Sequence, residues 1–126
     1  STQTIAASVN GNIRGITYLG GCDTCAALAD TDDQQDFYYN VIGPLTINSI
    51  TCFSDAGSPT VQVLRDDGSA ANILSASLAC QNAGTTSTSF VAGENSLSLG
   101  HKLDFTVVSA GGVAKRVTVV IKATVN

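Results

Sequence analysis

Charged side chains are scarce in this chain of 126 residues. They make up 13% of the sequence, against roughly 25% in an average soluble protein. Six residues are Lys or Arg, and the formal net charge is -4. Because the basic residues are scattered along the chain, the basic surface that nucleic-acid binding needs is absent. The chain also lacks an apolar run of about 18 residues, so no membrane-spanning helix is expected.

Side chains that commonly carry catalysis are also few. The chain has a single histidine, His101, and no Gly-x-Ser-x-Gly nucleophile motif. Asp36 and Glu94 are the carboxylates that a glycosidase pair would have to use, yet nothing in the sequence places them together. We therefore predict that the protein is not an enzyme.

What the chain does have is alternation of apolar and polar residues with a period of two, the pattern of half-buried strands. Turn residues separate the predicted strands, which are residues 37–42, 45–53, 60–66, 72–80, 86–92, 102–109 and 113–125. This pattern predicts one all-β domain over residues 1–126. Its expected form is a single β-sandwich or jelly roll of about seven to nine antiparallel strands.

The last two predicted strands show the alternation most clearly and define the expected core. The core face consists of Leu103, Phe105, Val107, Val117, Val119 and Ile121. Between these strands lies the sequence SAGG at 109–112, which predicts that they form the final hairpin of the domain.

Residues 1–19 are expected to form an N-terminal hairpin or an exchangeable strand. Asn10-Gly11 favours a two-residue turn that folds the first residues back onto their own domain. The alternation before that turn would equally allow strand addition to the sheet edge of a neighbouring copy. The residues assigned to this subunit contact are Thr4, Ile5, Ala7 and Val9.

The four cysteines are expected to form disulfides. Cys22 and Cys25 have the spacing of redox, zinc and haem motifs, but Ala26 stands where haem attachment needs a histidine. A second closely spaced ligand pair, which a zinc ribbon needs, is missing. The favoured pairing is Cys22–Cys25 and Cys52–Cys80, with links between the two sets as the alternative. Disulfides indicate an extracellular or virion-surface location.

Residues 20–36 are expected to form a long loop rich in Cys and Asp. Asp30, Asp32, Asp33 and Asp36 supply the hard oxygen ligands that calcium prefers, although their spacing does not match an EF-hand. A solvated loop stapled by its own disulfide is the simpler interpretation. Calcium is the one cofactor for which the sequence offers ligands.

Tyr38, Tyr39 and Asn40 suggest a surface that binds a glycan. Two tyrosines can form an aromatic platform for a sugar ring. This platform and the acidic loop support the alternative function, a carbohydrate-binding or adhesin module that is calcium-dependent and binds a cell-surface glycan. The other interpretation is one core tyrosine and one surface tyrosine.

The strands from about Leu45 to Val125 follow a distinctive order. They are TVQVLRDDGSAANILSASL, a Ser/Thr-rich TTSTSFVA, then LDFTV and a closing AGGVAKRVTVVIKAT. This region resembles the small β-sandwich structural proteins of tailed-phage virions, of the decoration and tail-fibre type, and similar extracellular filament subunits. The resemblance implies a non-enzymatic structural protein that self-assembles as a homo-oligomer or polymer. Residues 20–37 depart from the pattern and are the expected contact element.

Overall fold

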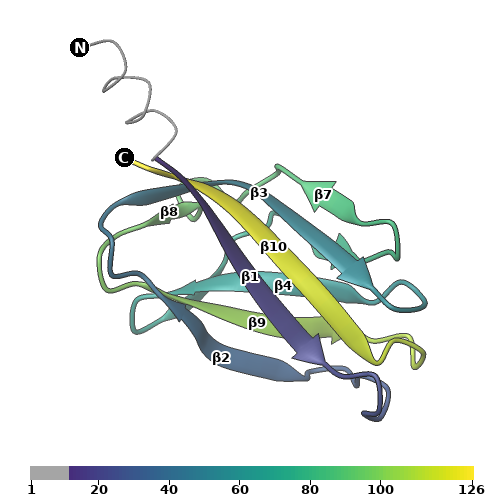
Figure 1. Cartoon of the computed structure of the whole chain (residues 1–126). Helices are drawn as coiled ribbons and strands as arrows, with labels where there is room; N and C mark the ends of the chain where they lie inside the picture. Colours follow the sequence, from purple (N-terminus) through teal and green to yellow (C-terminus); the bar gives the residue numbers. More distant parts are fainter. Residues whose placement is uncertain (1–11) are drawn as a thin grey trace.

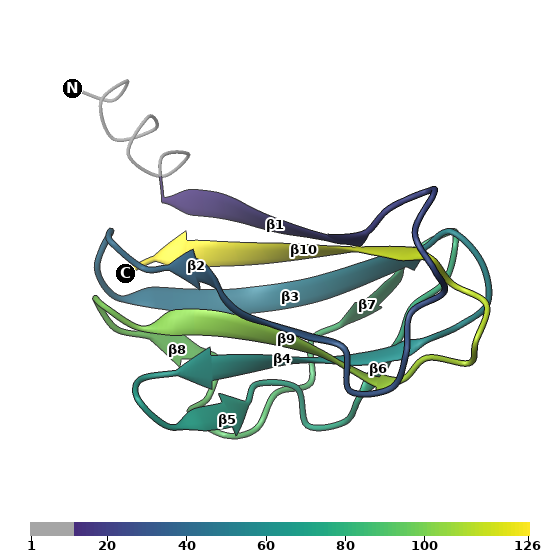
Figure 2. The same cartoon turned by 90° about the horizontal axis from the view of Figure 1, so that it is seen from below.

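Two antiparallel β-sheets pack face to face in the computed structural model of this chain (Figure 1, Figure 2). The structure describes residues 12–126, so the expected contact residues Thr4–Val9 and the Asn10-Gly11 turn lie outside the described part. Residues 12–126 form strands, turns and loops, with no helix that could cross a membrane.

The strands divide evenly between the sheets. Sheet A contains, in spatial order, β1 (Ile13–Gly21), β10 (Arg116–Val125), β3 (Leu45–Ser54) and β7 (Thr85–Ser87), with β8 (Ser96–Leu97) paired to the start of β3. Sheet B contains β2 (Asp33–Tyr39), β9 (Lys102–Ser109), β4 (Thr60–Asp66) and β5 (Ala70–Asn72), with β6 (Leu78–Ala79) also paired to β4.

The pairing order gives the fold its topology. The first strands pair with the last strands in reverse order: β1 with β10, β2 with β9, β3 with β7 and β8, and β4 with β5 and β6. The strands from β1 to β4 alternate between the two sheets, as do those from β8 to β10, whereas β4, β5 and β6 lie together in sheet B and β7 and β8 together in sheet A. A long antiparallel ribbon wrapped in this way is a jelly roll, which confirms the predicted fold class.

The predicted final hairpin is wrong. β9 and β10 lie in different sheets, so the SAGG segment crosses from one sheet to the other instead of closing a hairpin. The six residues of the predicted core face are nevertheless all buried. Alternation identifies the face of a strand that meets the core, but both sheets meet the same core, so it does not identify the sheet.

Several predicted boundaries also shift. The loop expected at 20–36 is shorter, because β1 continues to Gly21 and β2 begins at Asp33. β2 ends before the predicted 37–42 strand would, since the Asn40 side chain accepts the Ile42 N–H at 3.1 Å and so forms a turn. Most of the predicted 72–80 strand is not a strand: Asn72 ends β5, Leu78–Ala79 form β6, and these two short strands pair with opposite ends of β4.

A buried disulfide links the two sheets through the core. Cys52 on β3 in sheet A joins Cys80, which follows β6 in sheet B, and both residues are fully buried. The other disulfide joins Cys22 and Cys25 in the turn after β1. This is the pairing that the sequence favoured.

Candidate functional site

The aspartates of the loop after β1 hold the backbone in place. Asp30 accepts the Ala110 N–H at 2.7 Å, and Asp32 accepts the Ala29 N–H at 2.8 Å. The loop is fastened further by the Thr31 N–H, which donates to the carbonyl of Val107. These carboxylates therefore have structural partners on their own chain.

A different set of carboxylates comes together on the outer side of sheet B. Asp36 on β2, Asp66 on β4 and Asp104 on β9 have carboxylate oxygens within 4.8 Å of one another. Of the four predicted calcium ligands, Asp36 is the one that belongs to this group. We call these three residues the carboxylate cluster.

A bulge in β2 builds this cluster. The pairing of β2 with β9 shifts between Gln34 and Tyr38, and Asp36 within that interval has a positive φ of 57°. The Asp36 N–H consequently donates to the Asp104 side chain at 2.8 Å instead of to a strand carbonyl. Asp104 is 6% exposed, between the buried Leu103 and Phe105.

Burial and charge act together on Asp104. Burial raises its pKa above the ordinary value, the Asp36 N–H opposes that rise, and the Asp66 carboxyl adds to it. The nearest cation is Lys102, whose Nζ lies 3.7 Å from Asp36 Oδ2. Three clustered carboxylates of this kind can share a proton or offer oxygens to a hard cation such as calcium.

Sequence reasoning missed Asp66 and Asp104. Asp66 ends the predicted 60–66 strand, and its side chain accepts the Gly68 N–H at 2.9 Å. Asp104 alternates with core residues and looks like an ordinary outward-facing strand residue. Only the pairing of β2, β9 and β4 brings the three carboxylates together.

The expected sugar platform is not assembled. Tyr38 packs against the core, whereas Tyr39 is 54% exposed, as expected for strand neighbours that point to opposite faces. Asn40 is fully buried, and its amide donates to the carbonyls of Gly43 and Ser98 at 2.7 and 3.0 Å. Asn40 is therefore a structural residue of the turn after β2.

The residues considered for catalysis belong to separate local networks. Glu94 accepts Nη2 of Arg65 at 2.7 Å, while Asp36 lies in the carboxylate cluster. His101 Nδ1 accepts the Ser98 N–H at 3.1 Å.

The outer face of sheet A has a different character. Its cross-strand rows run Leu19–Thr118–Phe53 and Thr17–Val120–Thr51–Thr86. Leu19 is 72% exposed and Phe53 37% exposed. We define the A face by these two rows: Thr17, Leu19, Thr51, Phe53, Thr86, Thr118 and Val120.

These two rows of the A face contain no charged side chain; along β10 the row of Arg116 lies on one side of them and the row of Lys122 on the other. Some of their polar groups satisfy one another, as Thr51 and Thr86 share a hydroxyl hydrogen bond of 2.7 Å. Because these hydroxyls already have a partner, covering them costs less than covering unpaired polar groups.

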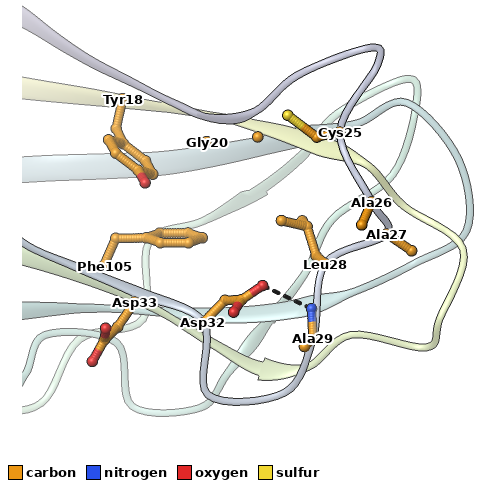
Figure 3. A pocket seen from close by; sticks show the side chains of 11 residues that line it. Tyr18, Gly20, Cys25, Ala26, Ala27, Leu28, Ala29, Asp32, Asp33 and Phe105 are labelled. Carbon is orange, nitrogen blue, oxygen red and sulfur yellow. Dashed lines mark hydrogen bonds between the residues drawn. The ribbon is translucent and has the colours of Figure 1, made fainter.

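A groove of about 480 Å³ lies beside the C-terminal half of β1 (Figure 3). Tyr18 of β1 and Phe105 of β9 form its inner end, with ring centroids 4.8 Å apart. Its outer wall is the loop after β1, where Ala26, Ala27 and Leu28 line it. Burial, followed by the negative charge of Asp32, raises the pKa of Tyr18.

No protein-family model and no curated protein sequence matches this chain. Solved structures that are similar in fold include the acid-stable capsid of Helicobacter pylori bacteriophage KHP30, with 12% identity, 90% of this chain and 93% of that chain covered, and a TM-score of 0.49. The cyanophage Pam1 capsid asymmetric unit gives 13% identity, 91% and 87% coverage, and a TM-score of 0.47.

A structure of infectious bursal disease virus, Gx strain, gives 14% identity and a TM-score of 0.32, with 90% of this chain and 37% of that chain covered. Two of these structures are of phage capsids.

Proposed function

We propose that this chain is a non-enzymatic structural protein, a self-assembling subunit of a virion surface or an extracellular filament. The observation that carries the proposal is the A face. It is a sheet surface on which Leu19 and Phe53 are exposed among threonines, without a charged side chain. Contiguous exposed apolar surface of this kind marks interaction sites.

The physical argument concerns desolvation. Charged side chains are depleted at the centres of protein interfaces because removing their water is expensive. The A face has none to desolvate, and its Thr51–Thr86 pair is already hydrogen-bonded. The two disulfides and the 13% charge content suit a subunit that persists outside the cell.

The test is the solution mass of the purified, unreduced protein, with electron micrographs of the same sample. We expect a defined ring, trimer or filament. A monomer of 12.8 kDa that persists at high concentration would contradict the proposal.

The alternative is a glycan-binding module that uses calcium. The carboxylate cluster favours it, because Asp104 and the outer side of β4 also line a hollow of about 210 Å³ on sheet B. Binding on a glycan array that is lost on adding a chelator would support this alternative. A blank array would remove it and leave the structural function unaffected.

A further inference from the structure

The four lateral edges of the two sheets are protected to very different degrees. β7 and β5, which end the two sheets on one side, are three residues long. β2 is interrupted by its bulge and carries Asp33 and Asp36. Short strands, bulges and charges are the usual means of preventing an edge from pairing with another chain.

β1 has none of these protections. It is nine residues long and pairs with β10 without a break from Ile13 to Gly21. It contains no proline, and its single charged residue is Arg14. Among the described strands it pairs with β10 alone; we call its other edge, which no described strand covers, the open edge.

The direction of the open backbone groups follows from one hydrogen bond. The Asn12 carbonyl accepts the Val125 N–H of β10 at 2.7 Å. In an antiparallel ladder, both backbone groups of a residue point to the same neighbour, and the next residue points the other way. The N–H and C=O groups of Ile13, Gly15, Thr17 and Leu19 therefore point outward.

The groove adds a side-chain requirement to this edge. Ile16 and Tyr18 point inward from β1, and Tyr18 lines the groove. A strand added to β1 would place every second side chain beside Ile16 and Tyr18 and over the groove. The added strand must therefore be apolar on that side and uncharged on the other, where it extends the A face.

The first residues of the chain meet this requirement. Residues 1–11, STQTIAASVNG, contain no charged side chain. Ile5, Ala7 and Val9 share one side of an extended strand, and Thr4, Ala6 and Ser8 share the other. Six extended residues span about 20 Å, which fits within the roughly 30 Å of β1.

The same Asn12 bond is incompatible with the two-residue turn that would supply that strand from the same copy. A two-residue turn at Asn10-Gly11 would make Val9 and Asn12 exchange both backbone hydrogen bonds. That exchange needs the Asn12 carbonyl on the open side of β1, but it points to Val125. A strand from another copy is not joined to Asn12 by a turn, so it does not need the Asn12 carbonyl on the open side of β1.

We infer that residues Thr4–Val9 of one copy add to the open edge of β1 in a second copy, with Ile5, Ala7 and Val9 facing the groove. This inference rests on the proposed function and names its contact. Each copy then donates at one site and accepts at another, which generates a ring or an open fibre.

Complementation between two variants tests it. Ile5→Asp with Val9→Asp disables the donor, and Thr17→Pro disables the acceptor by removing an outward N–H. We expect at least a tenfold rise in the half-assembly concentration for each variant alone. We expect their mixture to form a one-to-one complex. Thr4→Asn with Ser8→Asn is the matched control, because it changes the other side of the strand without adding charge, and it should assemble nearly as well as the native chain.

The outcomes separate the two proposals. If the native chain is monomeric, both the inference and the proposed function fail. If the native chain and the donor variant assemble alike, the inference fails and the proposed function stands. A mixture without the complex, from variants that keep native thermal melting, also overturns the inference.

Discussion

The outer faces of the two sheets differ in how they carry charge. The A face is uncharged and exposes Leu19 and Phe53. The outer side of sheet B gathers Asp36, Asp66 and Asp104 beside Lys102. Both faces belong to the same thin sandwich and cover the same core.

The difference between the outer faces does not arise from the core that the two sheets share. Inward residues of both sheets are buried aliphatic side chains, so the fold places similar demands on each. The outward residues do not pack in the core, so core packing does not explain why they differ between the sheets. Under the proposed function, the A face is the one covered by a neighbouring subunit and the outer side of sheet B stays in water.

The largest expected effect is the loss of stability when the covalent link between the two sheets is removed. Replacing Cys52 and Cys80 with Ala should lower the free energy of unfolding by about 3 kcal/mol, because the link closes a long loop in the unfolded chain. Urea denaturation of the unreduced protein measures the loss. Replacing Cys22 and Cys25 is the control, with a smaller loss expected for its short loop. Equal losses would show that loop length is not the cause.

The next effect tests the two faces directly. Val120→Asp puts a carboxylate in one of the two rows of the A face and should weaken assembly at least tenfold, which is about 1.4 kcal/mol. Val108→Asp makes the same change on β9, where Val108 is 47% exposed, and should leave assembly unchanged. Sedimentation at several concentrations measures both. Equal weakening by the two variants would remove the distinction between the faces.

A third prediction concerns the pH dependence of the acidic face. Because the pKa of Asp104 is raised in the folded protein, its contribution to stability is present at low pH and is lost as pH rises through that pKa. Asp104→Asn keeps the acceptor for the Asp36 N–H and should stabilise the protein at pH 7, with little change at pH 3. We expect a gain of less than about 1 kcal/mol, since water screens the exposed Asp36. Thermal melting across pH measures it, and a variant less stable at pH 7 would contradict it.

The smallest expected effect concerns the cation of the same face. Lys102→Gln removes an ion pair whose two side chains are 40% and 49% exposed. Exposed pairs of this kind contribute about 0.5 kcal/mol or less. Melting at low and high salt should show a slight loss that disappears with salt. A loss that persists in high salt would mean that Lys102 contributes by packing.

The strands were predictable where alternation is long. β3, β4 and β9 match the predicted segments to within one residue, since each has a continuous apolar side against the core. The 72–80 segment is predicted as one strand, but only Asn72 at the end of β5 and Leu78–Ala79 of β6 belong to strands, and the buried Ile73 and Leu74 lie between these two strands. Burial of a segment does not by itself require a continuous ladder.

The carboxylate cluster was predictable only in part. Asp36 drew attention because it lies in an acidic stretch, but its neighbours Asp30 and Asp32 accept backbone N–H groups instead of joining the cluster. Its actual partners, Asp66 and Asp104, are 30 and 68 positions away. Nothing local marks them, because their proximity depends on three strands lying side by side.

The sequence by itself determined that this protein is a disulfide-bonded, weakly charged β-sandwich, because period-two alternation, turn residues and composition are local properties. Only the tertiary structure decided which sheet each strand joins, which edge is open and which carboxylates meet. Those outcomes depend on pairings between distant segments, and a strand's own residues specify its faces but not its neighbours.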